Sequence, residues 1–304
     1  MSPEIKNIES SVRQQLLNIS RKRNEDFQFC LTRYALERFL YRLSKSSHAE
    51  KFVLKGAFLL MSWTQEPYRP TRDLDLLGYG DPGSPILNNM VTEICLENVV
   101  ADGLVFDADS LVIEEIRGEL DYGGKRIKMM AYLGKIRIPL QIDIAFGDAV
   151  SPSPEKIGYP TLLELPQAYI RAYPKETVVA EKIQAAIVLG IRNSRMKDFF
   201  DLLWLSRLFP FDSETLVRAI QATFNRRKTD FPTQEAFPLT EVFASDPAKQ
   251  TQWVAFLRKN DISHMPFELE KVISELAGFL VLPLKFASEA EAFDKTWEPG
   301  GPWH

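Results

Sequence analysis

The sequence predicts an α+β fold in which N-terminal helices and a small mixed sheet precede a C-terminal helical domain. Residues 72–78 and 135–145 alternate between polar and apolar side chains, which is typical of strands with one buried face. From Lys175 onward, apolar residues instead recur three and four positions apart, which is typical of helices. The strand pattern therefore belongs to the first half of the chain, and the helical pattern dominates the second half.

Composition places the chain among ordinary globular proteins. It has 304 residues, of which 45% are hydrophobic and 26% are charged, enough for one large domain or two medium ones. The net charge of −4 argues against a protein that coats nucleic acid nonspecifically. The two cysteines, Cys30 and Cys95, allow neither a disulfide framework nor a cysteine-rich zinc site. Residues 1–9 lack the apolar core of a signal peptide, and no apolar run reaches the ~18 residues of a membrane helix. We therefore expect a cytoplasmic protein with no membrane partner.

The N-terminal region predicts two amphipathic helices, followed by a strand, a tight turn and a third helix. Apolar residues recur at helical spacing in residues 8–20 and 27–43. Residues 51–56 form a short apolar run that ends in glycine, and the apolar segment 57–63 follows. The basic residues of the first two helices fit either a solvated face or contact with an RNA backbone. These basic residues are Arg13, Arg21, Lys22, Arg23, Arg33, Arg38 and Arg42.

The middle region predicts the sheet. A loop at residues 64–70 leads into the strand at residues 72–78, whose alternation places Asp73 and Asp75 on one face. In the strand at residues 135–145, Asp143 lies opposite the apolar face. The other elements expected here are a helix near residues 86–97, strands at residues 111–116 and 125–132, and a hairpin turn at Leu133-Gly134.

A proline-rich stretch, Ser151-Pro152-Ser153-Pro154, predicts a linker that extends past Pro160 and Pro166, because proline breaks both ladders and helices. We therefore expect one domain at residues 1–150 and a helical domain at residues 151–304. The helices expected in the second domain cover residues 176–192, 195–209, 213–226, 251–259 and 266–279. The last segment, residues 297–303, predicts no more than a turn.

Three aspartates carry the predicted chemistry. Asp73 and Asp75 are two positions apart on a strand, so their carboxylates project from one face and can converge on a hard cation such as Mg²⁺. Asp143 on another strand adds a third carboxylate, and several carboxylates are what a metal site for displacement at phosphorus requires. Taken singly, each of these aspartates also fits a solvated strand or turn position.

Other residues fit the recognition of a polyphosphate. Lys55-Gly56-Ala57 ends a strand and opens a helix, so its backbone N–H groups and the helix dipole can hold a phosphate, although a turn that needs a small residue explains it equally well. Lys182, on a predicted helix, can neutralise a triphosphate, or be one more solvated lysine. Asp198 and Asp201 lie three residues apart on one helical face with apolar neighbours, so these charges need partners.

In this order, the motifs resemble the DNA polymerase β-like nucleotidyltransferase superfamily, and within it the AbiEii/AbiGii toxin family. The resemblance covers nearly the whole chain. It is carried by Leu36-Glu37-Arg38-Phe39-Leu40-Tyr41-Arg42-Leu43, Phe52-Val53-Leu54-Lys55-Gly56, Arg72-Asp73-Leu74-Asp75, Gln141-Ile142-Asp143, Glu181-Lys182 with Ala185, Arg195 with Lys197-Asp198 and Asp201-Leu202, and the Pro-Gly-Gly-Pro-Trp ending. One departure is Ala57, where the superfamily motif often has Ser or Gly after the glycine.

The resemblance implies a polymerase β-like core and an enzyme that moves a nucleoside monophosphate from an NTP to an acceptor, releasing pyrophosphate. It further implies a toxin of a toxin–antitoxin or abortive-infection system with a cognate antitoxin protein, and tRNA is the acceptor we expect. Asp73 and Asp75 would bind Mg²⁺, with Asp143 completing the metal site or accepting the acceptor's proton. Lys182 would neutralise the triphosphate, and Asp198 would orient Lys182 or line the nucleotide pocket. Lys55, Gly56, Ala57 and Arg72 would lie near the phosphates.

Two alternatives remain at this point. A noncatalytic nucleotidyltransferase-fold module that binds a partner protein or RNA is favoured by the absence of a serine after Gly56. A metal-dependent nuclease is possible because paired carboxylates also cut phosphodiesters. Such nucleases commonly keep a lysine or histidine near the carboxylates, and the three histidines here, His48, His264 and His304, lie far from the aspartates in sequence.

Overall fold

The computed structural model describes residues 7–64, 69–80, 83–116, 123–262, 265–266, 268–289 and 294–304. The chain forms two compact units, Met1–Gly147 with Glu155–Ala172, and Asp148–Pro154 with Tyr173–His304. The boundary expected near residue 150 falls in the stretch where the chain passes between the units, and residues 155–172 pack with the first unit. Residues 65–68 of the expected loop, residues 1–6 of the N-terminal stretch, and His264 lie outside the described residues.

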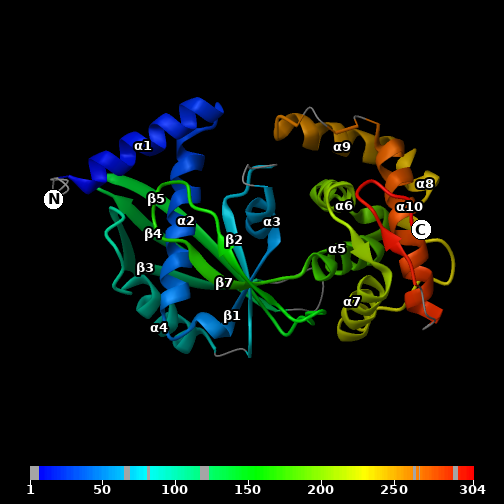
Figure 1. The fold of residues 1–304 in the computed structure, drawn as a ribbon, viewed down its shortest axis with the longest axis horizontal. Helices are drawn as coiled ribbons and strands as arrows, with labels where there is room; N and C mark the ends of the chain where they lie inside the picture. The colour runs from blue at the N-terminus through cyan, green and yellow to red at the C-terminus, as the bar shows by residue number, and fades with distance from the viewer. Residues whose placement is uncertain are drawn as a thin grey trace. The chain divides into compact units, whose positions relative to one another are not determined.

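A mixed sheet forms the centre of the first unit (Figure 1). In the described residues its strand order is β3-β4-β5-β2-β1-β7-β6. β2 runs parallel to β5 and β1 parallel to β7, whereas the other neighbours are antiparallel, so the predicted mixed sheet is confirmed. The strands are β1 (Phe52–Lys55), β2 (Asp73–Gly78), β3 (Leu104–Ile116), β4 (Gly124–Leu133), β5 (Ile136–Phe146), β6 (Glu155–Tyr159) and β7 (Ala168–Ala172).

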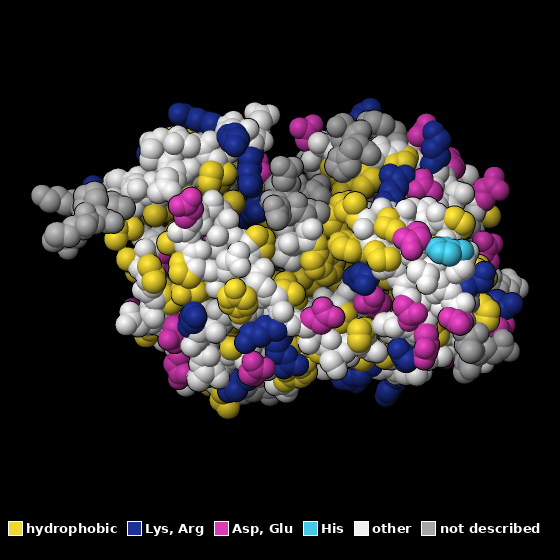
Figure 2. Space-filling view, viewed as in Figure 1, with side chains coloured by type: hydrophobic (Ala, Val, Ile, Leu, Met, Phe, Trp, Pro, Cys, Tyr) yellow, Lys and Arg dark blue, Asp and Glu magenta, His cyan; other side chains and the backbone are white. Residues whose placement is uncertain are grey.

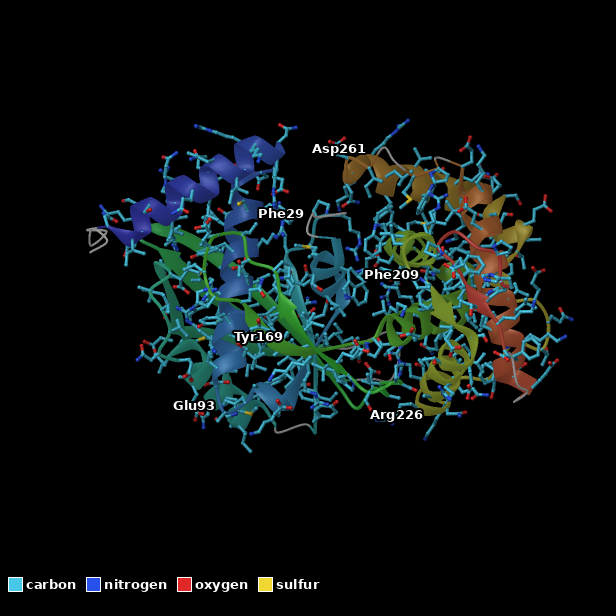
Figure 3. The ribbon with its side chains drawn as sticks, in the orientation of Figure 1. Phe29, Glu93, Tyr169, Phe209, Arg226 and Asp261 are labelled. Carbon is cyan, nitrogen blue, oxygen red and sulfur yellow. The ribbon has the colours of Figure 1, made fainter. Side chains whose placement is uncertain are left out.

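Two of these strands lie where a linker was expected. β6 and β7 pair antiparallel, from Glu155↔Ala172 to Tyr159↔Ala168. The prolines that suggested a linker flank the strands instead of interrupting them: Pro160 follows β6 and Pro166 precedes β7. Proline is compatible with a sheet when it lies outside the ladder, so the linker prediction was wrong for this segment. On β7, Tyr169 is 59% exposed (Figure 3).

Four helices of the described residues accompany the sheet: α1 (Ile8–Arg23), α2 (Phe27–Lys45), α3 (Gly56–Thr64) and α4 (Ser84–Cys95). The Asp26 carboxylate accepts a hydrogen bond from the Phe29 N–H (2.9 Å) and caps the start of α2. α2 packs against β5 and β7, and α4 packs against α2 and β3 (Figure 1). Glu93 of α4, labelled in Figure 3, contacts His48 beyond the end of α2 (2.7 Å).

α2 is not the amphipathic helix that its sequence suggested, because it is buried on all sides. Its arginines Arg33, Arg38 and Arg42 are 4%, 0% and 6% exposed, so neither a solvated face nor an RNA contact describes them. Arg38 and Arg42 instead bind the carboxylate of Asp102. The basic residues of α1, which are Arg13, Arg21, Lys22 and Arg23, are exposed, and Figure 2 shows Lys and Arg side chains over the end of this helix.

The second unit is mainly helical, as predicted. α5 packs against α6 and α7, and α10 packs against α6 and α7 (Figure 1). Its elements are α5 (Lys175–Leu189), α6 (Met196–Leu208), β8 (Phe211–Asp212), α7 (Ser213–Arg226), α8 (Glu241–Ala244), α9 (Pro247–Lys259), α10 (Leu269–Glu289) and β9 (Thr296–Trp297). None of the described helices of the protein combines the length and the apolar character that a membrane span requires.

The C-terminal segment is more than the predicted turn, because it packs back on the helices. The Trp297 indole N–H donates to the Ser206 carbonyl (2.7 Å), and the Trp303 indole N–H donates to the Phe279 carbonyl (2.9 Å). Both tryptophans are buried, and Phe279 lies against both rings. The segment therefore contributes aromatic core to the second unit.

Candidate active site

The three predicted aspartates come together on two neighbouring strands of the first unit. β2 and β5 run parallel with Asp75 opposite Asp143 and Asp73 opposite Gln141. Residues at paired positions project from the same face of a sheet, so the three carboxylates share one face. Leu74 and Leu76 between and beyond the aspartates are buried at 0% and 2% exposure, and their packing fixes the face on which Asp73 and Asp75 lie.

The glycine of Lys55-Gly56-Ala57 is required by its closeness to this carboxylate face. Gly56 has φ +68°, a backbone conformation that favours glycine, and it begins α3 directly after β1. A methyl group at Gly56 would lie 2.6 Å from Cγ of Asp75. The register also pairs Lys55 with Asp75. The first turn of α3, with N–H groups that lack helical partners, therefore starts beside Asp75, where an anion can bind.

Arg126 belongs to the same face and was missed by the sequence interpretation. It lies on β4 opposite Asp143 of β5. Its Nε donates to Asp143 Oδ1 (2.9 Å) and its Nη2 to Oδ2 (2.7 Å), which is a bidentate ion pair. The Asp143 carboxylate raises the pKa of Arg126 through these hydrogen bonds. The side chains of Arg126 and Asp143 are 35% and 17% exposed, so the pair is accessible to solvent.

The fit of a metal ion to these residues is partial. Asp73 and Asp75 offer carboxylates, which are the ligands that Mg²⁺ prefers, and Asp73 Oδ1 accepts a hydrogen bond from the backbone N–H of exposed Arg72 (3.1 Å). Arg126 takes both oxygens of Asp143. Consistent with this, the described part of the chain contains no group of three or more His, Cys, Asp or Glu side chains arranged to hold a metal ion.

The remaining predicted residues, Lys182 and Asp198, lie together in the second unit. Nζ of Lys182 on α5 is 2.8 Å from Asp198 Oδ1 and 2.7 Å from Asp201 Oδ2, both carboxylates being on α6. Nε of Arg195 lies 2.8 Å from the second Asp198 oxygen. Asp198 and Asp201 are almost completely buried, so these contacts compensate charges that would be costly alone. Asp201 had no predicted role, although its three-residue spacing from Asp198 places both on one helical face.

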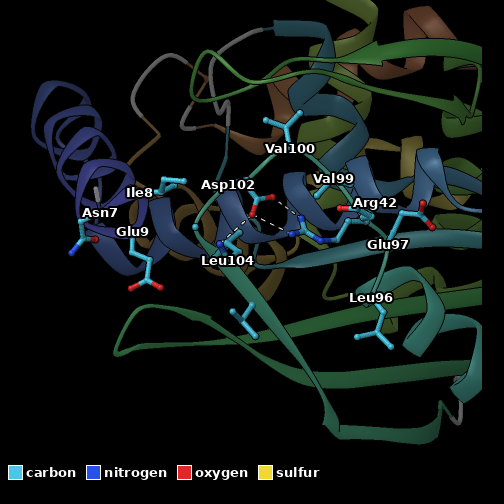
Figure 4. Close-up of a pocket in the computed structure, with 14 residues that line it drawn as sticks. Asn7, Ile8, Glu9, Arg42, Leu96, Glu97, Val99, Val100, Asp102 and Leu104 are labelled. Carbon is cyan, nitrogen blue, oxygen red and sulfur yellow. Dashed lines mark hydrogen bonds and ion pairs between the residues drawn. The ribbon is translucent and has the colours of Figure 1, made fainter. Parts of the chain in front are cut away.

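An open pocket of about 880 Å³ lies elsewhere in the first unit (Figure 4). It is lined by the start of α1, the segment from Leu96 to Val105, and Arg42, which Figure 4 shows bound to Asp102. None of the predicted site residues lines it. We therefore place the candidate active site of this unit at the carboxylate face and not at this pocket.

Comparison with known proteins supports an assignment for most of the chain. The profile of the family described as "Nucleotidyl transferase AbiEii toxin, Type IV TA system" matches residues 38–293. A crystal structure of a proposed nucleotidyltransferase from H. pylori has a TM-score of 0.50 at 16% identity, covering 86% of this chain and 98% of that one. The crystal structure of JHP933 from Helicobacter pylori has a TM-score of 0.48 at 16% identity, covering 86% and 92%. At this identity the first likeness shows the fold alone. Comparison with curated protein sequences gives no match.

Proposed function

Because the chain belongs to the AbiEii nucleotidyl transferase toxin family of type IV toxin–antitoxin systems, we propose that this nucleotidyltransferase moves a nucleoside monophosphate from an NTP to tRNA in a magnesium-dependent reaction. We further propose that it acts as the toxin of a toxin–antitoxin or abortive-infection system and that a cognate antitoxin protein restrains it. The observation that carries the catalytic proposal is the register of β2 and β5, which gathers Asp73, Asp75 and Asp143 on one face.

Each residue of the carboxylate face has a proposed task. Asp73 and Asp75 would hold the magnesium ion, which supplies a positive charge that stabilises the transferred phosphoryl group. The N–H groups at Gly56 and Ala57, together with Lys55 and Arg72, would bind phosphate oxygens. Asp143 would complete the metal site or accept the proton of the attacking hydroxyl group. The closeness of Gly56 to Asp75 supports placing the phosphates beside the carboxylates.

Three residues of the second unit also have proposed roles. Lys182 would neutralise the triphosphate and Asp198 would orient Lys182, a role that their 2.8 Å contact supports. Asp201 would share in this orientation through its own 2.7 Å contact with Lys182.

The catalytic proposal is tested by Asp75→Asn. The substitution keeps the shape of the side chain and removes its charge, so we expect nucleotide incorporation from labelled NTP to fall at least about a hundredfold, because a metal ligand contributes several kcal/mol to the transition state. Asp107→Asn, on β3 of the same sheet, is the matched control and should keep full activity. Full activity of the Asp75→Asn protein would refute the assignment.

The acceptor is tested with tRNA in the presence of magnesium, with and without NTPs. Lengthened RNA that requires NTP supports transfer to tRNA. Shortened RNA in the absence of NTP would instead indicate a nuclease, and magnesium-dependent NTP binding without any change to RNA would point to another acceptor or to a binding module.

A further inference from the structure

A row of charged side chains crosses five neighbouring strands of the first unit. The register pairs Glu114 of β3 with Arg126 of β4, Arg126 with Asp143 of β5, Asp143 with Asp75 of β2, and Asp75 with Lys55 of β1. Paired positions project from the same face, so two carboxylates lie between two cationic residues. Arg126 therefore lies between Glu114 and Asp143, next to the positions proposed for metal binding.

Arg126 already provides Asp143 with the neutralisation that a metal ion would provide. Its two hydrogen bonds, 2.9 and 2.7 Å long, engage both carboxylate oxygens. A guanidinium group does not lose its proton in proteins, so Arg126 keeps its positive charge beside Asp143. The Arg126 and Asp143 side chains are 35% and 17% exposed, so solvent reaches the pair and can hydrate each group when the contact opens. The pair can therefore open at a smaller cost than a fully buried ion pair would.

We propose that Arg126 is an internal counter-ion that competes with a divalent metal ion for Asp143. The proposal rests on the magnesium site of the proposed function and concerns its regulation. Without substrate, Arg126 neutralises Asp143 and lowers the affinity of the carboxylate row for the ion. Metal binding then requires an exchange in which the guanidinium leaves the carboxylate and the ion takes its place.

The test is Mn²⁺ binding to the full chain without nucleotide, measured by calorimetry for the wild type and for Arg126→Gln. Removing the competing charge should lower the dissociation constant about tenfold, because Asp143 then becomes available and carries an uncompensated charge. Lys128→Gln is the matched control. Lys128 lies two residues along the same strand, on the same face, and pairs with Glu114 at 2.8 Å. Its replacement also removes one positive charge, and the dissociation constant should change less than about twofold.

The possible outcomes distinguish the proposed role of Arg126 from the existence of the metal site. If wild type binds Mn²⁺ and Arg126→Gln binds it no more tightly, or if Lys128→Gln tightens binding equally, the role of Arg126 is refuted while the metal site stands. If no variant binds Mn²⁺, the metal site fails. Circular dichroism checks the fold of each variant. Arg126→Lys keeps the charge but not the bidentate geometry, so it should show an intermediate affinity and carries the test if the glutamine variant does not fold.

Discussion

The first unit contains two arginine–aspartate clusters that share their chemistry and differ in their surroundings. Asp102 binds Arg38 and Arg42 with all three side chains between 0% and 7% exposed, whereas the Asp143–Arg126 pair is 17% and 35% exposed. The Asp102 cluster also links segments far apart in sequence, while the Asp143 pair joins strands that are already neighbours. Burial and connectivity, more than the identity of the pair, therefore separate a structural cross-link from an exchangeable contact.

The largest expected effect is on the buried cluster. Asp102→Asn keeps a hydrogen-bonding oxygen but removes the charge that two buried guanidinium groups share, and Arg38 keeps only the more distant contact with Glu37, at 3.9 Å, among its ion pairs in the described residues. We expect the free energy of unfolding to fall by about 3–5 kcal/mol, as is typical when one partner of a buried ion pair is removed. Urea denaturation measures the change, with Asp107→Asn on β3 as the control. A loss below about 1 kcal/mol would remove the contrast between the two clusters.

The same buried region contains an acid whose effect on stability depends on pH. Burial raises the pKa of Glu37 from 4.5 to about 7, although the Leu162 N–H donates to its carboxylate and opposes the shift. In the unfolded chain this carboxyl ionises near 4.5, so the folded state keeps the proton to higher pH. The stability that Glu37 gives is therefore fully present below about pH 4.5 and is lost as the pH rises through about 7.

Glu37→Gln removes this titration. We expect the variant to be more stable than the wild type by about 2 kcal/mol at pH 8 and to differ little from it at pH 4, because the buried charge costs free energy only when it forms. Denaturation curves at both pH values measure the difference. Glu164→Gln changes an exposed glutamate close to Leu162 and should show no such pH-dependent gain. Equal stability of the Glu37→Gln protein and the wild type at pH 8 would contradict the proposed cost of burial.

The two clusters also show what local patterns in the sequence can and cannot predict. Alternation correctly predicted the face of Asp73 and Asp75, because in a strand the facing of a side chain depends on its nearest neighbours. The sequence also contains the information that pairs Arg126 with Asp143. A hairpin turn at Gly134 pairs Leu133 with Ile136, and counting away from the turn along both strands places these two residues opposite each other.

The Asp102 cluster had no comparable signal. Arg38 and Arg42 lie 64 and 60 residues from Asp102, and no spacing rule connects them. Helical periodicity alone does not distinguish buried arginines from arginines on a solvated face of a helix. β7 likewise pairs with a strand far away in the sequence, since Ala172 lies opposite Leu54 of β1, and β6 joins the sheet through β7.

The smallest expected effect is on the partly exposed pair of Asp143 and Arg126. Asp143→Asn should reduce the free energy of unfolding by about 1 kcal/mol, less than Asp102→Asn, because solvent reaches the partly exposed pair and can hydrate the guanidinium group once the pair is broken. A double-mutant cycle with Arg126→Gln isolates the coupling, which 1 M NaCl should reduce further because salt screens accessible charges. The corresponding cycle with Asp102→Asn and Arg42→Gln should give a larger coupling that changes little with salt. If the Asp143 coupling proved as large and as salt-insensitive as that of Asp102, the pair would be a fixed structural contact, and displacement of Arg126 by an ion would be too costly.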